Sequence, residues 1–150
     1  MEKSNKKILF ICIIILLIVC ILICILYKSF NKSEFNQKCD ELEKRFIMNQ
    51  NTFGKVSDLI KLDFDYVYSF EPYKSIESMI SEIGFYSKYL KETHSEGTFN
   101  LVFVKDKEVV CVLSGNGEKG YYIELEYGKY SKEVICEKEY IVEENKYLLK

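Results

Sequence analysis

The amino-acid sequence predicts an α+β protein in which an N-terminal transmembrane helix precedes a small helix-β-α-β-β-β-β domain with a mainly antiparallel sheet. Three observations lead to this fold class. Residues 8–27 form an apolar run of twenty residues without a charge, a proline or a glycine. Two segments after it repeat apolar residues at helical spacing. The second half of the chain carries apolar or alternating runs that are typical of strands.

The apolar run has the length of a membrane-spanning helix, because twenty residues at 1.5 Å each cover about 30 Å of hydrocarbon. A cleaved secretory signal would have a shorter apolar region and a small-residue cleavage site, whereas this chain contains no alanine. A lipoprotein signal is a second alternative, but bulky residues precede Cys20 and Cys24 where a small one is needed. We therefore expect an uncleaved helix that contacts the lipid bilayer through residues 8–27.

The charges at the two ends of this run predict its orientation. The short tail at 1–7 carries three lysines and one glutamate, whereas the other flank mixes lysines with acidic residues. Because cytoplasmic flanks are enriched in lysine and arginine, we expect a cell-membrane protein with its N-terminus inside. Residues 31–150, with 17 basic and 22 acidic side chains, would then lie outside.

Four segments are predicted along the chain. A short cytoplasmic tail at 1–7 and the transmembrane helix at 8–27 come first, and a juxtamembrane linker and helix follow at 28–50. The helix, at 34–50, has an apolar stripe on one face. It either packs on the following domain or dimerises as a coiled coil, although two heptads are short for a coiled coil. The extracytoplasmic α+β domain occupies 51–150.

Within this domain, turn and cap signals divide the strands from one short helix. Ser75 is placed as an N-cap and Gly84 as a C-terminal glycine of a helix between them. Apolar residues at successive positions predict central strands that are covered on both faces. The predicted strands are residues 64–70, 99–104, 109–113, 121–127 and 134–142.

Composition excludes several functions and leaves no recognisable catalytic set. The net charge of −5 over residues 31–150 argues against nucleic acid as a partner, because such binding relies on basic surfaces. His94 is the single histidine, so a histidine-rich metal site or a zinc-protease motif is excluded. Asp63 and Asp65 are too few for a calcium site, and residues 114–120 lack the phosphate-loop order. We expect no catalytic, cofactor-binding or metal residues and no cofactor.

The corner after the first predicted strand is the candidate partner-binding site. Pro72 and Tyr73 lie between that strand and the capped helix, and loops carry function more often than cores do. Exposed aromatic residues are enriched at interaction surfaces. The alternative is turn chemistry alone, because proline fixes φ and tyrosine packs on the corner.

The cysteines outside the apolar run are expected to be free thiols. Cys39, Cys111 and Cys136 are an odd number, which does not suit a disulfide framework. Cys111 and Cys136 lie in apolar surroundings typical of small buried residues. A Cys111–Cys136 bridge would need their strands to pair in the right register. Cys39 lies on the helix stripe, where it is placed to link two chains.

One stretch resembles a known group of proteins. Residues 59–77, then Ile83-Gly84, then the hairpin at 101–110 are similar to an uncharacterised family of membrane-anchored or lipoprotein-like proteins of low-GC Gram-positive bacteria. In that family an aromatic-Asp-x-Val-Tyr-x-Phe strand leads into Pro-Tyr and a capped helix. The resemblance implies an anchored extracytoplasmic domain, with no activity attached to it.

These observations predict a single-pass membrane protein that acts by binding, either alone or within an envelope assembly with another envelope protein. The alternative is an extracytoplasmic enzyme of the hydrolase type. A nucleophile, base and orienting group that would indicate such an enzyme are not recognisable in the sequence. A deep polar cleft would favour the enzyme, and an apolar-aromatic patch would favour the binding module.

Overall fold

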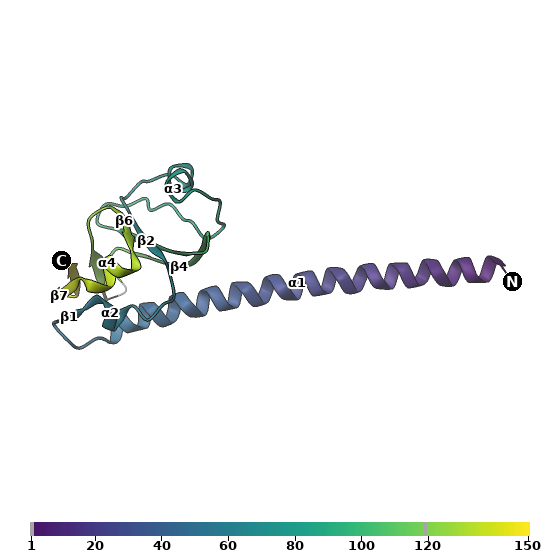
Figure 1. Ribbon diagram of the computed structural model, residues 1–150, viewed down its shortest axis with the longest axis horizontal. Coiled ribbons are helices and arrows are strands. Elements are labelled where there is room, and N and C mark those ends of the chain that lie inside the picture. Colours follow the sequence, from purple (N-terminus) through teal and green to yellow (C-terminus); the bar gives the residue numbers. More distant parts are fainter. Residues whose placement is uncertain (1, 119) are drawn as a thin grey trace. The chain divides into compact units, whose positions relative to one another are not determined.

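The computed structural model describes the backbone of residues 2–118 and 120–150, and the side chains of residues 13–27, 30, 34–118 and 120–150. The chain divides into two units, Met1–Phe35 and Asn36–Lys150. Figure 1 colours the chain from purple at the N-terminus to yellow at the C-terminus and labels helices and strands where there is room. The second unit carries both sheets and begins fifteen residues earlier than the domain predicted at 51–150.

The first unit is helical. The helix α1 runs over Glu2–Met48 without interruption, so no linker separates the apolar run from the helix predicted at 34–50. Apolar side chains from Ile13 to Tyr27 are exposed in this unit. The last turns of α1, from Asn36 to Met48, belong to the second unit.

The predicted transmembrane helix requires a correction. Among the side chains that the structure describes, no helix is both long and apolar enough to cross a membrane. This finding contradicts the span predicted at 8–27, and with it the single-pass location with an inside N-terminus. The described part of the apolar run begins at Ile13 and covers about 22 Å at 1.5 Å per residue, less than the roughly 30 Å of a hydrocarbon core. The side chains of the tail at 1–7 and of residues 8–12 lie outside the described ones.

The second unit is an α+β fold with two sheets, and not the single sheet that we predicted. After α1 it contains three short helices: α2 (Val56–Leu59), α3 (Ile76–Ile83) and α4 (Lys132–Glu137). Its strands in chain order are β1 (Phe53–Lys55), β2 (Tyr66–Phe70), β3 (Phe99–Lys105), β4 (Glu108–Gly115), β5 (Tyr122–Glu124), β6 (Gly128–Ser131), β7 (Glu139–Glu143) and β8 (Lys146–Leu149).

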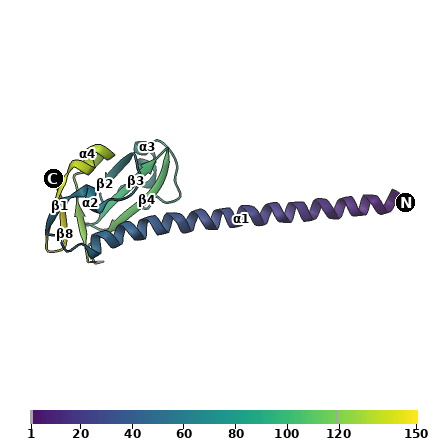
Figure 2. The same cartoon turned by 60° about the horizontal axis from the view of Figure 1, so that its bottom comes forward.

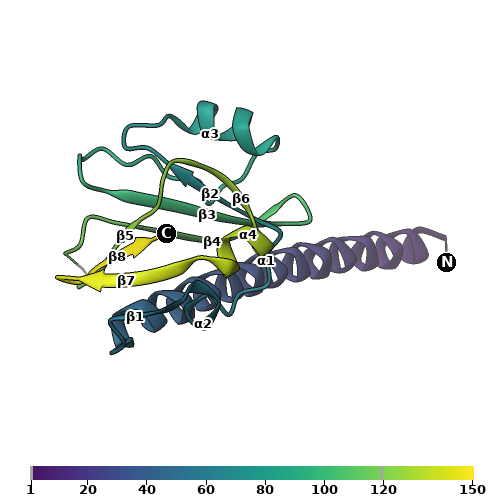
Figure 3. The same ribbon diagram turned by 60° about the vertical axis from the view of Figure 1, so that its left-hand side comes forward.

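Each sheet has four strands. One sheet has the order β4-β3-β2-β6 and is antiparallel throughout; Figure 2 shows β2, β3 and β4 side by side. The other sheet has the order β1-β7-β8-β5, in which β5 pairs in parallel with β8; Figure 3 shows β7, β8 and β5 together. Most strand pairs are therefore antiparallel, as the sequence predicted.

The hairpin of β3 and β4 confirms the predicted central strand at β3 and corrects the one at 109–113, because β4 is an edge strand whose burial alternates along the chain. Residues 99–104 of β3 are all buried, because this strand lies between two neighbours and is covered on both faces. A register shift between Phe103 and Val104 marks a bulge against β4. Asp106 and Lys107 form the turn with positive φ, as expected for a two-residue hairpin turn.

The helix α3 begins and ends at the residues that the sequence marked. The Ser75 side chain accepts a hydrogen bond from the Ser78 backbone N–H at 3.2 Å. Gly84 ends the helix with φ 86°, a conformation that costs glycine nothing. Met79 and Ile83 are buried on the inner side of this helix.

The hydrophobic core lies between the two sheets and the end of α1. Leu42 and Phe46 of α1 are 2% and 1% exposed and belong to the same buried cluster as the sheet residues. Phe46 stacks on Tyr121, with ring centroids 5.7 Å apart, and meets Tyr147 edge-on at 5.1 Å. The helix therefore packs on its own domain, which is the first of the two alternatives left open for residues 34–50.

Two strand predictions in the last third were wrong. The predicted strand at 121–127 pairs only over Tyr122–Glu124. Residues 134–137 belong to α4, whose N-cap Ser131 accepts a hydrogen bond from the Val134 backbone N–H. The serine cap outweighs the β preference of the apolar residues that follow it.

Candidate functional site

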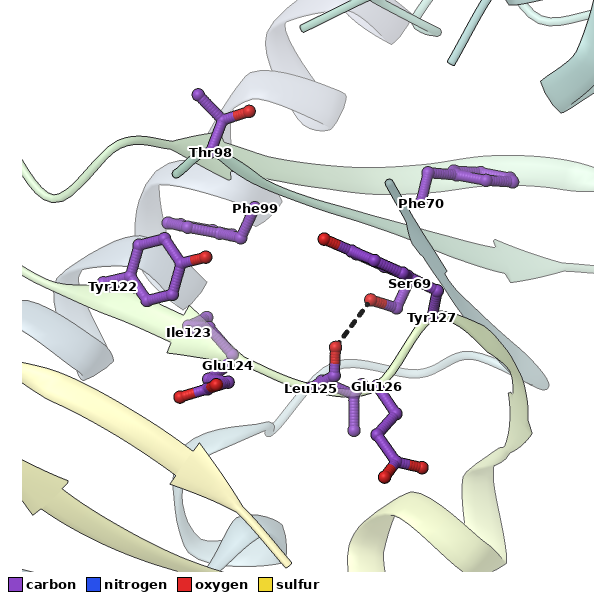
Figure 4. A pocket seen from close by; sticks show the side chains of 10 residues that line it. All are labelled: Ser69, Phe70, Thr98, Phe99, Tyr122, Ile123, Glu124, Leu125, Glu126 and Tyr127. Atoms are coloured by element: carbon purple, nitrogen blue, oxygen red, sulfur yellow. Dashed lines mark hydrogen bonds between the residues drawn. The ribbon is translucent and has the colours of Figure 1, made fainter. Parts of the chain in front are cut away.

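A pocket of about 430 Å³ opens between the ends of the two sheets, and Figure 4 shows it from close by. This volume lies within the range of small-ligand sites, roughly 300–1,000 Å³. Two lining residues come from the end of β2, two are the first residue of β3 and the residue before it, and six come from one continuous segment. They are Ser69, Phe70, Thr98, Phe99 and residues 122–127.

Three aromatic rings line the inner part of the pocket. Phe99 is 4% exposed and meets the Tyr122 ring edge-on, with centroids 5.6 Å apart and planes at 86°. Tyr127 is 61% exposed, and in Figure 4 its ring extends into the pocket with the hydroxyl directed toward Phe99. Phe70 points away from this group. The pocket therefore has a rigid aromatic wall and one exposed aromatic side.

The chain after β5 is held in place by β2. The Ser69 hydroxyl donates a hydrogen bond to the Leu125 carbonyl oxygen at 3.3 Å, and both residues are buried. Ser69 also pairs with Gly128 at the start of β6. Gly128 has φ 148°, which few side chains tolerate. These contacts fix the segment that carries Tyr127 from both ends.

The charged groups of the pocket are acidic. The Glu124 carboxylate forms an ion pair with Lys146 at 2.6 Å, and this pairing raises the pKa of Lys146. The Lys146 ammonium also lies 5.6 Å from the centre of the Tyr122 ring, a cation–π distance. Burial raises the pKa of Tyr122. Glu126 is exposed, and Figure 4 shows both carboxylates extending away from the rings.

The lining residues do not form a catalytic set. The ten residues of the pocket include hydroxyls and carboxylates but no histidine, cysteine or lysine. The Ser69 hydroxyl already donates to a backbone carbonyl, so it is not paired with a general base as an activated nucleophile would be.

The predicted partner site at Pro72 and Tyr73 lies near this pocket but not in it. Tyr73 is 59% exposed with φ 64°, and its backbone N–H donates to the Thr93 carbonyl at 2.8 Å. Neither residue lines the pocket, which ends at Phe70 on this strand. The role of the corner in binding stays a prediction.

The other sequence candidates lie apart on the surface. His94 has a side chain that is 76% exposed, with its Nε2 3.8 Å from Glu92. Asp63 forms ion pairs with Lys105 and with Lys132, the latter at 3.5 Å. The hydrogen bond from Lys105 lowers the pKa of Asp63. Among the described residues, no three metal-ligating side chains gather into a possible ion site.

The structure places Cys111 near Cys39, and not in the Cys111–Cys136 bridge that was considered from the sequence. Cys39, Cys111 and Cys136 are free, and the Val112 backbone N–H, next to Cys111, donates to the Cys39 Sγ of α1 at 3.3 Å. The notable partner of Cys111 is thus on the helix and not on the segment of Cys136. No motif signals this contact, because the two residues are far apart in the sequence.

Sequence reasoning missed the aromatic pocket. Tyr122 and Tyr127 were assigned to one strand, which would place them on opposite faces. The signal that was available is Gly128, which directly follows Tyr127 and breaks the strand.

Comparisons of the chain with protein-family models, with curated proteins and with solved structures give no match. The resemblance to the Gram-positive family therefore stays a prediction.

Proposed function

We propose that this protein is a non-catalytic binding module whose pocket receives an arginine side chain of a partner protein. The observation that carries the proposal is the combination of Phe99, Tyr122 and Tyr127 with two carboxylates at one opening. A planar guanidinium stacks on aromatic faces and is more weakly hydrated than an ammonium. Arginine is also enriched at protein interfaces.

The protein's own Lys146 supports the choice of a cation. Its ammonium group lies against Glu124 and the Tyr122 ring, so a positive charge already occupies one side of the opening. On the other side, the Tyr127 ring is 61% exposed and extends into the pocket (Figure 4). A second cation entering there would meet the exposed ring of Tyr127.

The field of the site favours the same ligand. The lining residues carry two acidic side chains, of which Glu124 is paired with Lys146 and Glu126 is exposed. Because the carboxylates extend away from the rings, they act on a ligand through their field and not through direct contact. Such a field raises the local concentration of cations and their association rate. The enzyme alternative has no comparable support from this pocket.

Tyr127→Ala in the full chain is the variant that tests this proposal. The probe is the blocked tripeptide acetyl-Gly-Arg-Gly-amide, and its affinity is measured by isothermal titration. Removing the exposed ring should weaken binding about 2- to 30-fold, the range expected for one cation–π contact. Replacing arginine by citrulline, its neutral isostere, should weaken binding to a similar extent.

Two further variants control this experiment. Tyr86→Ala removes another exposed ring, 75% exposed against 61% for Tyr127, that does not line the pocket, and should leave the affinity unchanged. Lys146→Gln removes the internal cation and should strengthen binding. Equal affinity for the arginine and citrulline probes, or equal losses for Tyr127→Ala and Tyr86→Ala, would contradict the proposal.

A further inference from the structure

Two thiols from distant parts of the sequence meet where the end of α1 lies beside β4. Cys39, on the helix, is half-buried, and Cys111, on the strand, is fully buried. The Cys39 Sγ accepts a hydrogen bond from the Val112 backbone N–H at 3.3 Å, which places it beside Cys111, the residue before Val112 in β4. Both sulfurs therefore lie within reach of each other in the folded unit.

The position of Cys39 is set by the edge of a sheet. β4 is an edge strand, and edge strands carry backbone groups that lack a neighbouring strand. The Cys39 sulfur supplies the acceptor for one of these groups, the Val112 N–H. The helix thus covers the edge at this point, and it brings the first thiol to the second.

We propose that Cys39 and Cys111 form an oxidation-sensitive dithiol, which closes to a disulfide when a hydroperoxide reaches Cys39. Two features of the structure support Cys39 as the group that reacts first. Cys39 is the more accessible of the two residues, and its sulfur accepts the Val112 N–H, a hydrogen bond that stabilises a thiolate.

The pKa shifts of the three thiols agree with Cys39 as the group that reacts first. The hydrogen bond from Cys111 lowers the pKa of Cys39, against the opposing effects of burial and of the Asp40 and Glu43 charges. The same hydrogen bond and burial raise the pKa of Cys111. Burial raises the pKa of Cys136. A thiolate is the reactive form towards peroxides, so Cys136 is a matched control.

The reaction consumes one hydroperoxide for each bridge. The Cys39 thiolate attacks one peroxide oxygen and breaks the O–O bond, which gives a sulfenic acid and the reduced alkoxide or hydroxide. The Cys111 sulfur then attacks the Cys39 sulfur and displaces the hydroxyl group, which leaves as water with the Cys111 proton. Two electrons pass from the two sulfurs to the peroxide, and one S–S bond forms.

The bridge would connect α1 to β4 covalently. In the reduced protein the end of this helix is held by packing and by hydrogen bonds such as that of Cys39. A disulfide between distant residues stabilises the folded state mainly by restricting the unfolded chain. Oxidation should therefore raise the unfolding midpoint of the unit and hold the helix on the sheet edge.

Mass spectrometry of the full chain tests the proposal. The native protein is treated with hydrogen peroxide, alkylated under denaturing conditions and digested with trypsin, which releases Cys39 in residues 39–44 and Cys111 in residues 108–119. We expect a linked peptide of these two segments that disappears on reduction with dithiothreitol. The segment 133–138, with Cys136, should remain alkylated.

Variants separate this reaction from general thiol oxidation. Cys39→Ser keeps an acceptor for Val112 and should abolish the linked peptide. Cys111→Ser should instead leave a Cys39 sulfenic acid that a dimedone probe labels, and circular dichroism checks the fold of both variants. The proposal is overturned if Cys39 and Cys111 both stay alkylated after peroxide treatment, or if Cys39 is found linked only to another copy of itself.

Discussion

Replacing Phe46 with alanine is expected to lower the free energy of unfolding by about 3–5 kcal/mol, the usual loss for a large aromatic residue in a core. Phe46 is 1% exposed and lies against two other buried rings, those of Tyr121 and Tyr147. The cavity would open beside these two rings, within the buried cluster that the end of α1 shares with the sheets. Urea unfolding of the full chain, followed by near-UV circular dichroism, measures the change.

The neighbouring Ile47 provides the matched control for this prediction. Ile47 is 48% exposed on the same turn of α1, so Ile47→Ala should change the free energy of unfolding by no more than about 0.5 kcal/mol. Similar effects of the two substitutions would mean that the end of α1 does not belong to the core. The unit would then begin nearer to residue 51 than to Asn36.

Tyr147→Phe is expected to cost about 1–3 kcal/mol, although it removes only one oxygen atom. The Tyr147 hydroxyl donates to the Phe46 carbonyl oxygen at 2.6 Å in a buried position. Because α1 ends at Met48, this carbonyl is among the last four of the helix and has no partner within it. The variant leaves that carbonyl buried without a donor. Thermal and urea unfolding both report the loss.

Tyr140→Phe is the comparison for this substitution. The Tyr140 hydroxyl is 3.5 Å from Asn49 Oδ1, at the limit of a useful hydrogen bond. Its loss should be clearly smaller than that of Tyr147→Phe, even though both tyrosines are almost fully buried. The reverse order would show that the helix end is satisfied by something other than Tyr147.

Helix caps and runs of apolar residues correctly predicted the elements that depend on residues close together in the sequence. Ser75 and Gly84 mark α3 because caps act within one turn. The apolar run of β3 predicts a central strand, and the structure places β3 between two strands. The same prediction for β4 was wrong, because β4 lies at the edge of the sheet. The prediction failed at residues 134–137, where Ser131 caps a helix within an apolar, β-branched stretch.

The division into two sheets and the aromatic pocket depend on long-range pairing, which periodicity does not report. β8 was not predicted. It pairs in parallel with β5 over Tyr122–Glu124, so residues 125–127 of the strand predicted at 121–127 lie outside the sheet. Tyr127 is exposed as a result. Pro72 and Tyr73 are the partner-binding corner that the sequence predicts. The pocket is lined by Ser69 and Phe70, which come just before this corner in the chain. The contact of Cys39 with Cys111 is of the same long-range kind.

The central claim is that the pocket beside Tyr127 is a binding site for a basic side chain. Mapping of the acetyl-Gly-Arg-Gly-amide tripeptide on the isotopically labelled full chain by NMR tests this claim most directly. The account predicts that chemical-shift changes concentrate at residues 69–70, 98–99 and 122–127, and that the citrulline tripeptide reduces them. Changes centred on Pro72 and Tyr73, or spread evenly over acidic surface residues, would contradict it.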